Sequence, residues 1–377
     1  MIYNNFQNKK LPALGMGCMR LPGGGYGNEY IDIEATEKMV EYAMNNGVNY
    51  FDTAWGYHCG KSEIVMGEIL KKYPRESFYL ASKFPGYDLS LVGRVEEIFE
   101  EQLKKCQVDY FDFYMFHNVC EVNIDAYLDE KNGIFEYLLK QKQNGRIKHL
   151  GFSAHGSLDV MKRFIEKYGK DMEFCQIQLN WLDWHFQGAD RKVDLLNSHN
   201  IPIWVMEPLR GGSLVKLSDE QKNTLKQLHP DFSVPKWSFS FLQGIKGVTL
   251  TLSGMSTFEQ LEENIAVYSN IAPLSTDECE TLFSIAKEKT SKNTLPCTAC
   301  QYCVTHCPQG INIPRIIELY NEQIYSGGGF LINLSVRSLP DDKKPSACLH
   351  CRACEEVCPQ NIKISEMMSD FSEKLKL

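Results

Sequence analysis

The chain lacks the features that would assign it to a membrane, to an export route or to nucleic acid. No apolar run is long enough to span a bilayer, and the first ten residues, MIYNNFQNKK, lack the apolar core of a signal peptide. The formal net charge is −8, the pI is near 5.7 and basic clusters are missing, which argues against nucleic acid as a main partner. We therefore expect a cytoplasmic protein that binds neither membranes nor nucleic acid.

A common nucleotide-binding signature is missing as well. No G-x-G-x-x-G run follows the first expected strand and opens a helix, as the dinucleotide-binding form of an open, doubly wound sheet requires. The run GGGYG, from Gly23 to Gly27, is interpreted as a loop. The 377 residues, 43% of them hydrophobic and 23% charged, are ample for one large globular domain and a small one.

Most of the chain repeats one unit, from about Lys10 to about Ser269. In each unit a short β-rich run is followed by an amphipathic helical run. Eight alternations over roughly 250 residues predict an α/β fold, a (β/α)8 TIM barrel, with a doubly wound open sheet as the alternative. The expected strands are GMGCMRL, NYFDTAW, SFYLASKF, YFDFYMFH, IKHLGFS, FCQIQLNW, PIWVMEP and GVTLTLSG.

The character of the sequence changes after a helix that we expect from Ser275 to Lys289. From about Lys292 onward the chain is poor in β-pattern and rich in cysteine, proline and turn residues. We therefore expect two domains, a barrel over residues 1–290 and a small domain over residues 291–377. Three successive glycines at 327–329 mark a loop within the small domain.

Eight of the fourteen cysteines form two short runs. Each run has the spacing C-x2-C-x2-C-x3-C-P, which is typical of bacterial ferredoxins with [4Fe–4S] clusters. Three thiolates spaced two residues apart can converge on one cluster, and in two-cluster ferredoxins the fourth binds the other cluster. Structural zinc is the alternative, although zinc sites usually pair two C-x2-C elements around a longer spacer. The expected ligand sets are Cys297, Cys300, Cys303 and Cys358 for one cluster, and Cys348, Cys351, Cys354 and Cys307 for the other. This part of the chain resembles bacterial two-cluster ferredoxins, with a longer stretch between the runs.

Polar side chains follow several of the expected barrel strands, where the active sites of such barrels lie. Asp52 and Tyr57 follow the second strand, Lys83 ends the third and His117 ends the fourth. Reduction of a carbonyl needs a hydride on carbon and a proton on oxygen. A tyrosine near an ammonium can supply that proton, the ammonium being held by a carboxylate, and a histidine can orient the carbonyl. Each residue alone also has an ordinary structural interpretation, as a loop cap, an ion-pair partner or a core histidine.

From about Leu11 to Ser269 the chain resembles the aldo/keto reductase family. The matching pieces are FDTAWGY, the ASK strand end, FYMFHN, GFS, QIQLN and SGMSTFEQLEEN. The resemblance implies Tyr57 as general acid, tuned by Lys83 and Asp52, with His117 as the fourth member. It also implies a nicotinamide cofactor, NAD(H) or NADP(H), whose carboxamide Ser153 and Gln176 hold. The remaining expected cofactor contacts are Met206 at the nicotinamide, Leu209, Arg210, Gly211 and Gly212 at the pyrophosphate, and Gly254, Gln260, Glu263 and Asn264 at the adenosine end.

The sequence departs from the family pattern at the cofactor contacts. NADPH-specific members place a Lys and an Arg around the 2′-phosphate, where this chain has Gly254 and Gln260. A doubly charged phosphate favours cations, so the sequence favours NADH slightly. Ala154 replaces the usual Asn after Ser153, and Met206 replaces the aromatic that stacks on nicotinamide.

The combination of a barrel and clusters leaves three functional hypotheses. In the first, the barrel interconverts a small carbonyl and an alcohol, and the clusters exchange electrons with a redox partner protein. In the second, the clusters of an ordinary nicotinamide-dependent reductase are structural or redox-sensing. In the third, an inactive barrel serves as an electron carrier or regulator. A hydride carries two electrons whereas a cluster moves one, and a flavin normally mediates between them, although the sequence shows no flavin motif.

Overall fold

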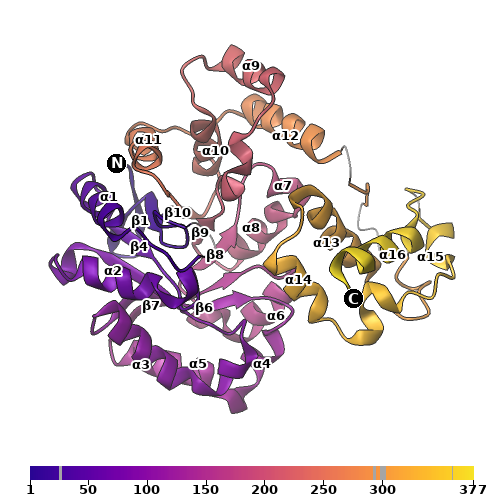
Figure 1. The fold of residues 1–377 in the computed structure, drawn as a ribbon, viewed down its shortest axis with the longest axis horizontal. Coiled ribbons are helices and arrows are strands. Elements are labelled where there is room, and N and C mark those ends of the chain that lie inside the picture. The colour runs from indigo at the N-terminus through magenta and orange to yellow at the C-terminus, as the bar shows by residue number, and fades with distance from the viewer. Residues whose placement is uncertain (25–27, 292–293, 298–302, 359) are drawn as a thin grey trace. The chain divides into compact units, whose positions relative to one another are not determined.

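Eight parallel strands close into a barrel in the order β10-β3-β4-β5-β6-β7-β8-β9 (Figure 1). This confirms the predicted (β/α)8 fold and excludes the open sheet. The computed structural model describes residues 1–24, 28–291, 294–297, 303–358 and 360–377. The barrel strands are β3 (Leu14–Gly17), β4 (Tyr50–Asp52), β5 (Tyr79–Phe84), β6 (Phe111–Val119), β7 (Ile147–Ala154), β8 (Cys175–Gln178), β9 (Ile203–Met206) and β10 (Val248–Ser253).

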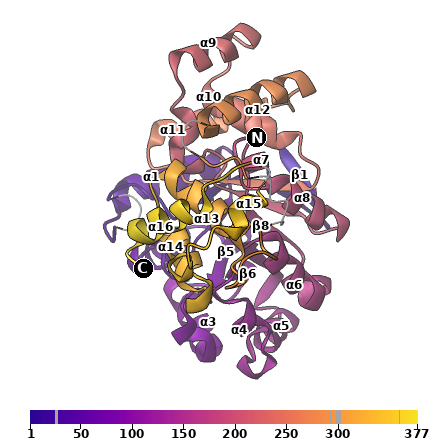
Figure 2. The same cartoon turned by 90° about the vertical axis from the view of Figure 1, so that its right-hand side faces the viewer.

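Helices surround the barrel, with α3, α4 and α5 on one side and α10 and α11 on the other (Figure 2). The first of them, α1, begins at the N-cap Asp32, which accepts from the N–H of Ala35. It ends before Gly47, whose φ of 82° favours glycine. The helices are α1 (Ile33–Asn45), α2 (Ser62–Leu70), α3 (Val95–Cys106), α4 (Ile124–Leu128), α5 (Ile134–Gln143), α6 (Leu158–Tyr168), α7 (Asp183–Phe186), α8 (Ala189–Ser198), α9 (Asp219–Leu228), α10 (Val234–Gln243), α11 (Phe258–Ser269) and α12 (Thr276–Ser291).

A two-stranded hairpin precedes the barrel and was not predicted. It pairs β1 (Tyr3–Phe6) with β2 (Lys9–Pro12). Phe6 is buried and lies edge-on to His149 and Trp204, with ring centroids 5.0 Å apart in both cases. The hairpin therefore adds an aromatic side chain to the barrel core.

The chain divides into two units, Met1–Leu282 and Phe283–Leu377. The described part of the second unit contains helices and no strand. These are the end of α12, which crosses the boundary, and α13 (Ile313–Ser326), α14 (Phe330–Arg337), α15 (Ala353–Glu356) and α16 (Ile364–Leu375). Its own core includes Ile316, Val336 and Phe371. The loop expected at the three glycines 327–329 separates α13 from α14.

Two further expectations concern the whole chain. Residues 25–27 of the expected GGGYG loop lie outside the described residues. Every helix in the described ranges is too short or too polar to cross a bilayer.

A half-buried group of polar and charged side chains joins β7 to the segment before β8. Glu173 lies 2.6 Å from the Lys142 ammonium and 2.8 Å from Nδ1 of His149, and it accepts from the N–H of Leu150. Burial favours the neutral acid. The bonds from His149, Lys142 and Gln7 outweigh it and lower the pKa of Glu173 to about 2. The ionised carboxylate therefore stabilises the fold.

The depressed pKa predicts how stability depends on pH. Because the ordinary pKa is near 4.5, the contribution of Glu173 is complete above that pH and is lost as the pH falls towards 2. We expect Glu173→Gln to lower the free energy of unfolding at pH 7 by about 2 kcal/mol and to flatten its decline at acidic pH. Denaturant unfolding at several pH values measures both effects. As a control, Glu100→Gln removes a more exposed partner of Arg146 and should cost less than about 1 kcal/mol. Equal costs for the two variants would contradict the prediction.

Candidate active site and cluster site

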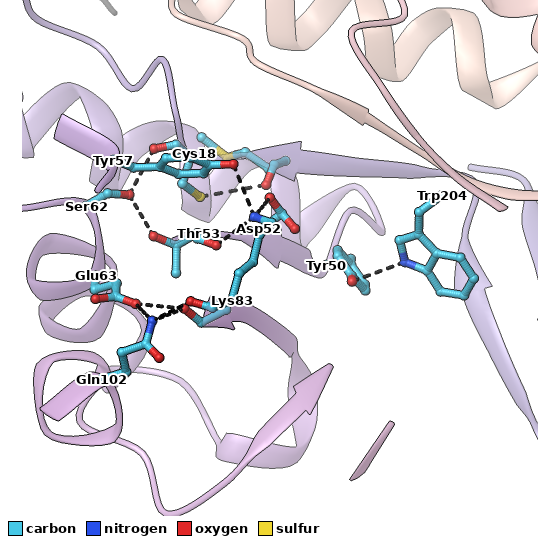
Figure 3. Close-up of polar contacts among 12 residues, drawn as sticks. Cys18, Tyr50, Asp52, Thr53, Tyr57, Ser62, Glu63, Lys83, Gln102 and Trp204 are labelled. Atoms are coloured by element: carbon cyan, nitrogen blue, oxygen red, sulfur yellow. Dashed lines mark hydrogen bonds and ion pairs between the residues drawn. The ribbon is translucent and has the colours of Figure 1, made fainter. Parts of the chain in front are cut away.

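The buried ammonium of Lys83 connects three groups at the ends of β4 and β5 (Figure 3). Its Nζ lies 2.5 Å from Oδ1 of Asp52, 2.8 Å from the carbonyl oxygen of Thr53 and 3.1 Å from the hydroxyl of Tyr57. An ammonium has three hydrogens, so these acceptors use all of them. Because Lys83 donates to the Tyr57 oxygen, the phenol's own hydrogen points away from Lys83 and is available to another acceptor.

Burial and charge act in opposite directions on this group. Burial disfavours the ammonium of Lys83, but the Asp52 carboxylate and Tyr57 outweigh it and raise the pKa. Burial also raises the pKa of Tyr57, and Lys83 only partly offsets this effect. The Tyr57 pKa therefore stays above its ordinary value. A protonated Tyr57 beside a charged Lys83 is suited to donate a proton.

His117, at the end of β6, lies edge-on to Tyr57 with ring centroids 6.1 Å apart. Burial, then Lys83 and His155, keep the pKa of His117 well below its ordinary value, so its imidazole is neutral. Its Nδ1 has no hydrogen-bond partner within the described ranges. The structure thus brings the four residues predicted for catalysis to one end of the barrel.

Two residues beside His117 were missed by sequence reasoning. Tyr87, in the loop after β5, lies edge-on to His117 at 5.2 Å between ring centroids. His155 follows β7, and burial together with Lys192 and Lys83 lowers its pKa to about 4. Both follow strands that carry predicted site residues, and that position is the only signal that could have indicated them.

A second buried carboxylate fixes the outer side of β5. Glu63 of α2 accepts from Ser82 and from Gln102 of α3, both at 2.7 Å. Gln102 also donates to the carbonyl oxygen of Lys83 at 3.0 Å, and Tyr114 donates to Gln102 at 2.5 Å. Figure 3 shows Glu63 and Gln102 beside the backbone of Lys83. The network holds the strand that carries the ammonium.

Ser153 and Gln176 are directly paired across β7 and β8, and both are buried. In the described part of the chain, Oγ of Ser153 and Oε1 of Gln176 have no hydrogen-bond partner. Buried polar atoms are rarely left unpaired. A carboxamide group, which both donates and accepts, would satisfy both atoms, so the two residues fit the carboxamide of a nicotinamide.

The loop after β9 contains the residues predicted at the pyrophosphate. Met206 ends β9, and Leu209 precedes a 3-10 helix over Arg210–Val215. Arg210 (φ 49°), Gly211 (63°) and Gly212 (87°) have left-handed backbone, which glycine adopts without strain. However, Nε of Arg210 donates to both carboxylate oxygens of buried Asp183, at 3.0 and 3.1 Å. The Arg210 guanidinium therefore already has an anionic partner.

Arg20 is a cation near the cofactor contacts that sequence reasoning missed. It follows β3 and pairs with Glu207 at 3.1 Å. A side chain built at Gly254 would meet the Arg20 side chain at 3.6 Å, and one at Gly211 would meet its guanidinium at 3.2 Å. Arg20 thus lies between the loops after β9 and β10, beside positions where the sequence offered no cation.

The adenosine-end candidates lie after β10 and on α11. Asn264 is buried and donates to Ser253 at 3.1 Å, whereas Glu263 is exposed. Gln260 of the first turn donates its N–H to the side chain of the N-cap Thr257. Its side chain accepts from the N–H of Ser256 at 2.8 Å.

One set of cysteines in the second unit surrounds a common pocket. Four thiols line it: Cys307, Cys348, Cys351 and Cys354. This set combines the fourth cysteine of the first run with the first three of the second run. Cys300 lies outside the described residues. Of the others, Cys303 is buried, and Cys297 and Cys358 are half-buried.

Contacts outside the thiols also tie the two cysteine runs together. Lys343 donates to the carbonyl oxygen of Gln309, and the Gln309 side chain donates to the carbonyl of Ala347 at 3.4 Å. Burial, then the nearby Cys348, raise the pKa of Cys354 to about 12. Four cysteine thiols around one pocket are the donor set of an iron–sulfur cluster, so the residues present fit such a group.

Comparison with family models assigns most of the chain. Residues 13–287 match the model of the aldo/keto reductase family, and residues 296–362 match that of a 4Fe-4S dicluster domain. The first match covers the barrel and the second covers both cysteine runs.

Curated relatives are similar to the chain at low identity. A Glycine max protein named as probable aldo-keto reductase 1 is 28% identical over 237 residues, which are 60% of this chain and 65% of that protein. The uncharacterized oxidoreductase YqkF of Bacillus subtilis is 26% identical over 74% of this chain and 94% of its own length. An NADH-specific methylglyoxal reductase of Escherichia coli is 25% identical over 68% of this chain and 89% of its own length.

Solved structures share the barrel. The aldo-keto reductase AKR11C1 of Bacillus halodurans has a TM-score of 0.61 at 22% identity, covering 76% of this chain and 97% of its own. A Klebsiella pneumoniae aldo-keto reductase in complex with NADPH has a TM-score of 0.59 at 18% identity, covering 76% and 96%. Together with the family match, the barrel and its strand-end residues show that the chain is an oxidoreductase of the aldo/keto reductase family that carries a 4Fe-4S dicluster domain.

Proposed function

We propose that the barrel interconverts a small carbonyl compound and its alcohol with a nicotinamide cofactor. The observation that carries this proposal is the arrangement around Lys83. Its ammonium binds Asp52, Thr53 and Tyr57 at once, and so directs the Tyr57 proton towards a substrate oxygen. The reaction type agrees with the family to which the chain belongs.

Each residue has a defined part in the proposed reduction. The bound nicotinamide would supply a hydride to the carbonyl carbon. Tyr57 gives its proton to the carbonyl oxygen, and the Lys83 ammonium at 3.1 Å stabilises the phenolate that remains. The neutral imidazole of His117 donates a hydrogen bond to the same oxygen and orients it. Ser153 and Gln176 would hold the carboxamide, since each has a buried atom without a partner in the described residues.

The proposed cofactor preference is NADH. Gly254 and Gln260 offer no cation where a 2′-phosphate would lie, and Arg20 beside Gly254 is already paired with Glu207. A relative is named as NADH-specific, whereas a structural neighbour was solved with NADPH.

For the second unit we propose two [4Fe–4S] clusters with crossed ligands that exchange electrons with a redox partner protein. The pocket lined by Cys307, Cys348, Cys351 and Cys354 supports the crossing. The alternative is that the clusters are structural or redox-sensing. A flavin would be needed to divide a hydride into single electrons. Participation of a flavin would therefore support electron exchange over structural or redox-sensing clusters.

Removal of the Tyr57 hydroxyl tests the barrel chemistry. We expect Tyr57→Phe to lower kcat for carbonyl reduction by about 100-fold or more, because the proton donor is lost. Binding of NADH, measured by quenching of tryptophan fluorescence, should change by less than about twofold. Tyr3→Phe, at an exposed site, is the control with unchanged kcat. Full turnover in Tyr57→Phe would refute the reductase assignment.

Anaerobic titration tests the coupling of clusters and barrel. We expect NADH to bleach cluster absorbance in the full chain in the presence of a flavin, because the hydride must be converted to single electrons. Cys351→Ser removes a ligand of one of the two proposed clusters, so it should lessen the bleaching and slow the transfer to an external one-electron acceptor. Cys279→Ser, which lies outside both runs, is the control. If Cys351→Ser keeps transfer to that acceptor at the normal rate, the clusters do not carry the electrons.

A further inference from the structure

The residue after Tyr57 makes two hydrogen bonds to a different part of the chain. His58 is buried, and its Nε2 accepts from the N–H of Leu21 at 3.1 Å. Its Nδ1 lies 2.9 Å from the carbonyl oxygen of Asn28. A carbonyl only accepts, so Nδ1 carries the hydrogen and Nε2 is the acceptor. Burial lowers the pKa of His58, which favours this neutral form.

The peptide group that joins Arg20 to Leu21 is held on both sides. Its N–H donates to His58, and its carbonyl oxygen accepts from the Ser256 hydroxyl at 2.8 Å. The N–H of Ser256 in turn donates to the side chain of Gln260 at 2.8 Å. One chain of hydrogen bonds thus runs from the proposed adenosine end to the residue beside Tyr57.

The backbone at His58 depends on such bonds. His58 and Cys59 have φ values of 49° and 54°, and left-handed backbone is unfavourable for residues other than glycine. Persistence of this conformation requires that the surroundings hold it in place. Tyr57 starts the same 3-10 turn, over Tyr57–Gly60. Loss of the hydrogen bonds of the His58 ring would therefore move the Tyr57 hydroxyl relative to Lys83.

We propose that His58 is a positioning residue that couples cofactor binding at the β10 end of the mouth to the placement of Tyr57, through the Arg20–Leu21 peptide group. The inference rests on the proposed function. Arg20 itself lies beside Gly254 and Gly211, so a cofactor bound along these loops would contact the segment that His58 holds. The coupling therefore needs only this one peptide group, with no movement of the barrel.

Two conservative variants separate this role from a structural one. His58→Gln places an amide oxygen near the former Nε2 and can still accept from Leu21. His58→Asn reaches only the former Nδ1 position and keeps just the bond to Asn28. We expect His58→Asn to lower kcat roughly tenfold and to weaken NADH binding roughly fivefold, as the loss of a buried hydrogen bond implies. His58→Gln should stay within about threefold of wild type on both measures.

A double-mutant cycle in the full chain tests the coupling itself. Ser256→Ala removes only the bond to the Arg20 carbonyl, and its effect on NADH binding should largely disappear in the His58→Asn background. Contacting groups in one network show such non-additivity, whereas independent sites multiply. His199→Asn, at an exposed helix end, is the control without effect. Melting temperatures report whether each variant is folded.

The outcomes distinguish the hypotheses. The coupling role would be overturned if His58→Asn kept kcat and NADH binding while His58→Gln lost them, or if both variants lost them equally. It would also be overturned if the effects of Ser256→Ala and His58→Asn on NADH binding simply multiplied. If His58→Asn does not fold, His58→Gln takes its place in the cycle. Because His58→Gln keeps the hydrogen bond from Leu21, Ser256→Ala must then weaken NADH binding as much in the His58→Gln background as it does in wild type. Retained turnover in Tyr57→Phe would instead refute the proposed function, whatever the His58 variants show.

Discussion

The charged ammonium of Lys83 is the constraint on which the barrel mouth depends. A buried ammonium without partners would cost several kcal/mol, and here Asp52, Thr53 and Tyr57 supply an acceptor for each of its hydrogens. These partners come from β4 and the turn that follows it, so the pairing of β4 with β5 fixes the geometry. The outer network of Glu63 and Gln102 then holds β5 from the helix side. The Tyr57 hydroxyl is therefore positioned by the fold itself.

The order of the barrel elements and the strand-end residues could be predicted because their signals are local. Each strand is a short apolar run followed by a helical pattern, and Asp52, Tyr57 and Lys83 follow such runs. The β1–β2 hairpin was missed because YNNF and KKLP are short and polar, and only Phe6 is fully buried in β1. Composition could not show that the Phe6 side chain packs against His149 and Trp204 in the barrel core.

The contacts that could not be predicted join residues far apart in the sequence. Arg20 meets Glu207 and Gly254 only because β3 lies between β10 and β4 in the closed barrel. The direction of the Tyr57 pKa shift could not be judged from the sequence for a related reason. Lys83 alone would lower it, but the burial of the phenol, which depends on the whole mouth, acts more strongly. Sequence thus indicates which groups are present, whereas the balance between burial and charge requires coordinates.

The two units depend on charge in different ways. At the barrel mouth the charge of the Lys83 ammonium is balanced by the Asp52 carboxylate at 2.5 Å. In the second unit, by contrast, Cys303 and Cys354 belong to the hydrophobic core together with Ile316 and Phe371. Thiolates buried in such a core require bound cations, and loss of a cluster would therefore disturb the packing of that unit. Removal of iron is thus expected to destabilise the second unit while the ion pair of Lys83 and Asp52 in the barrel stays in place.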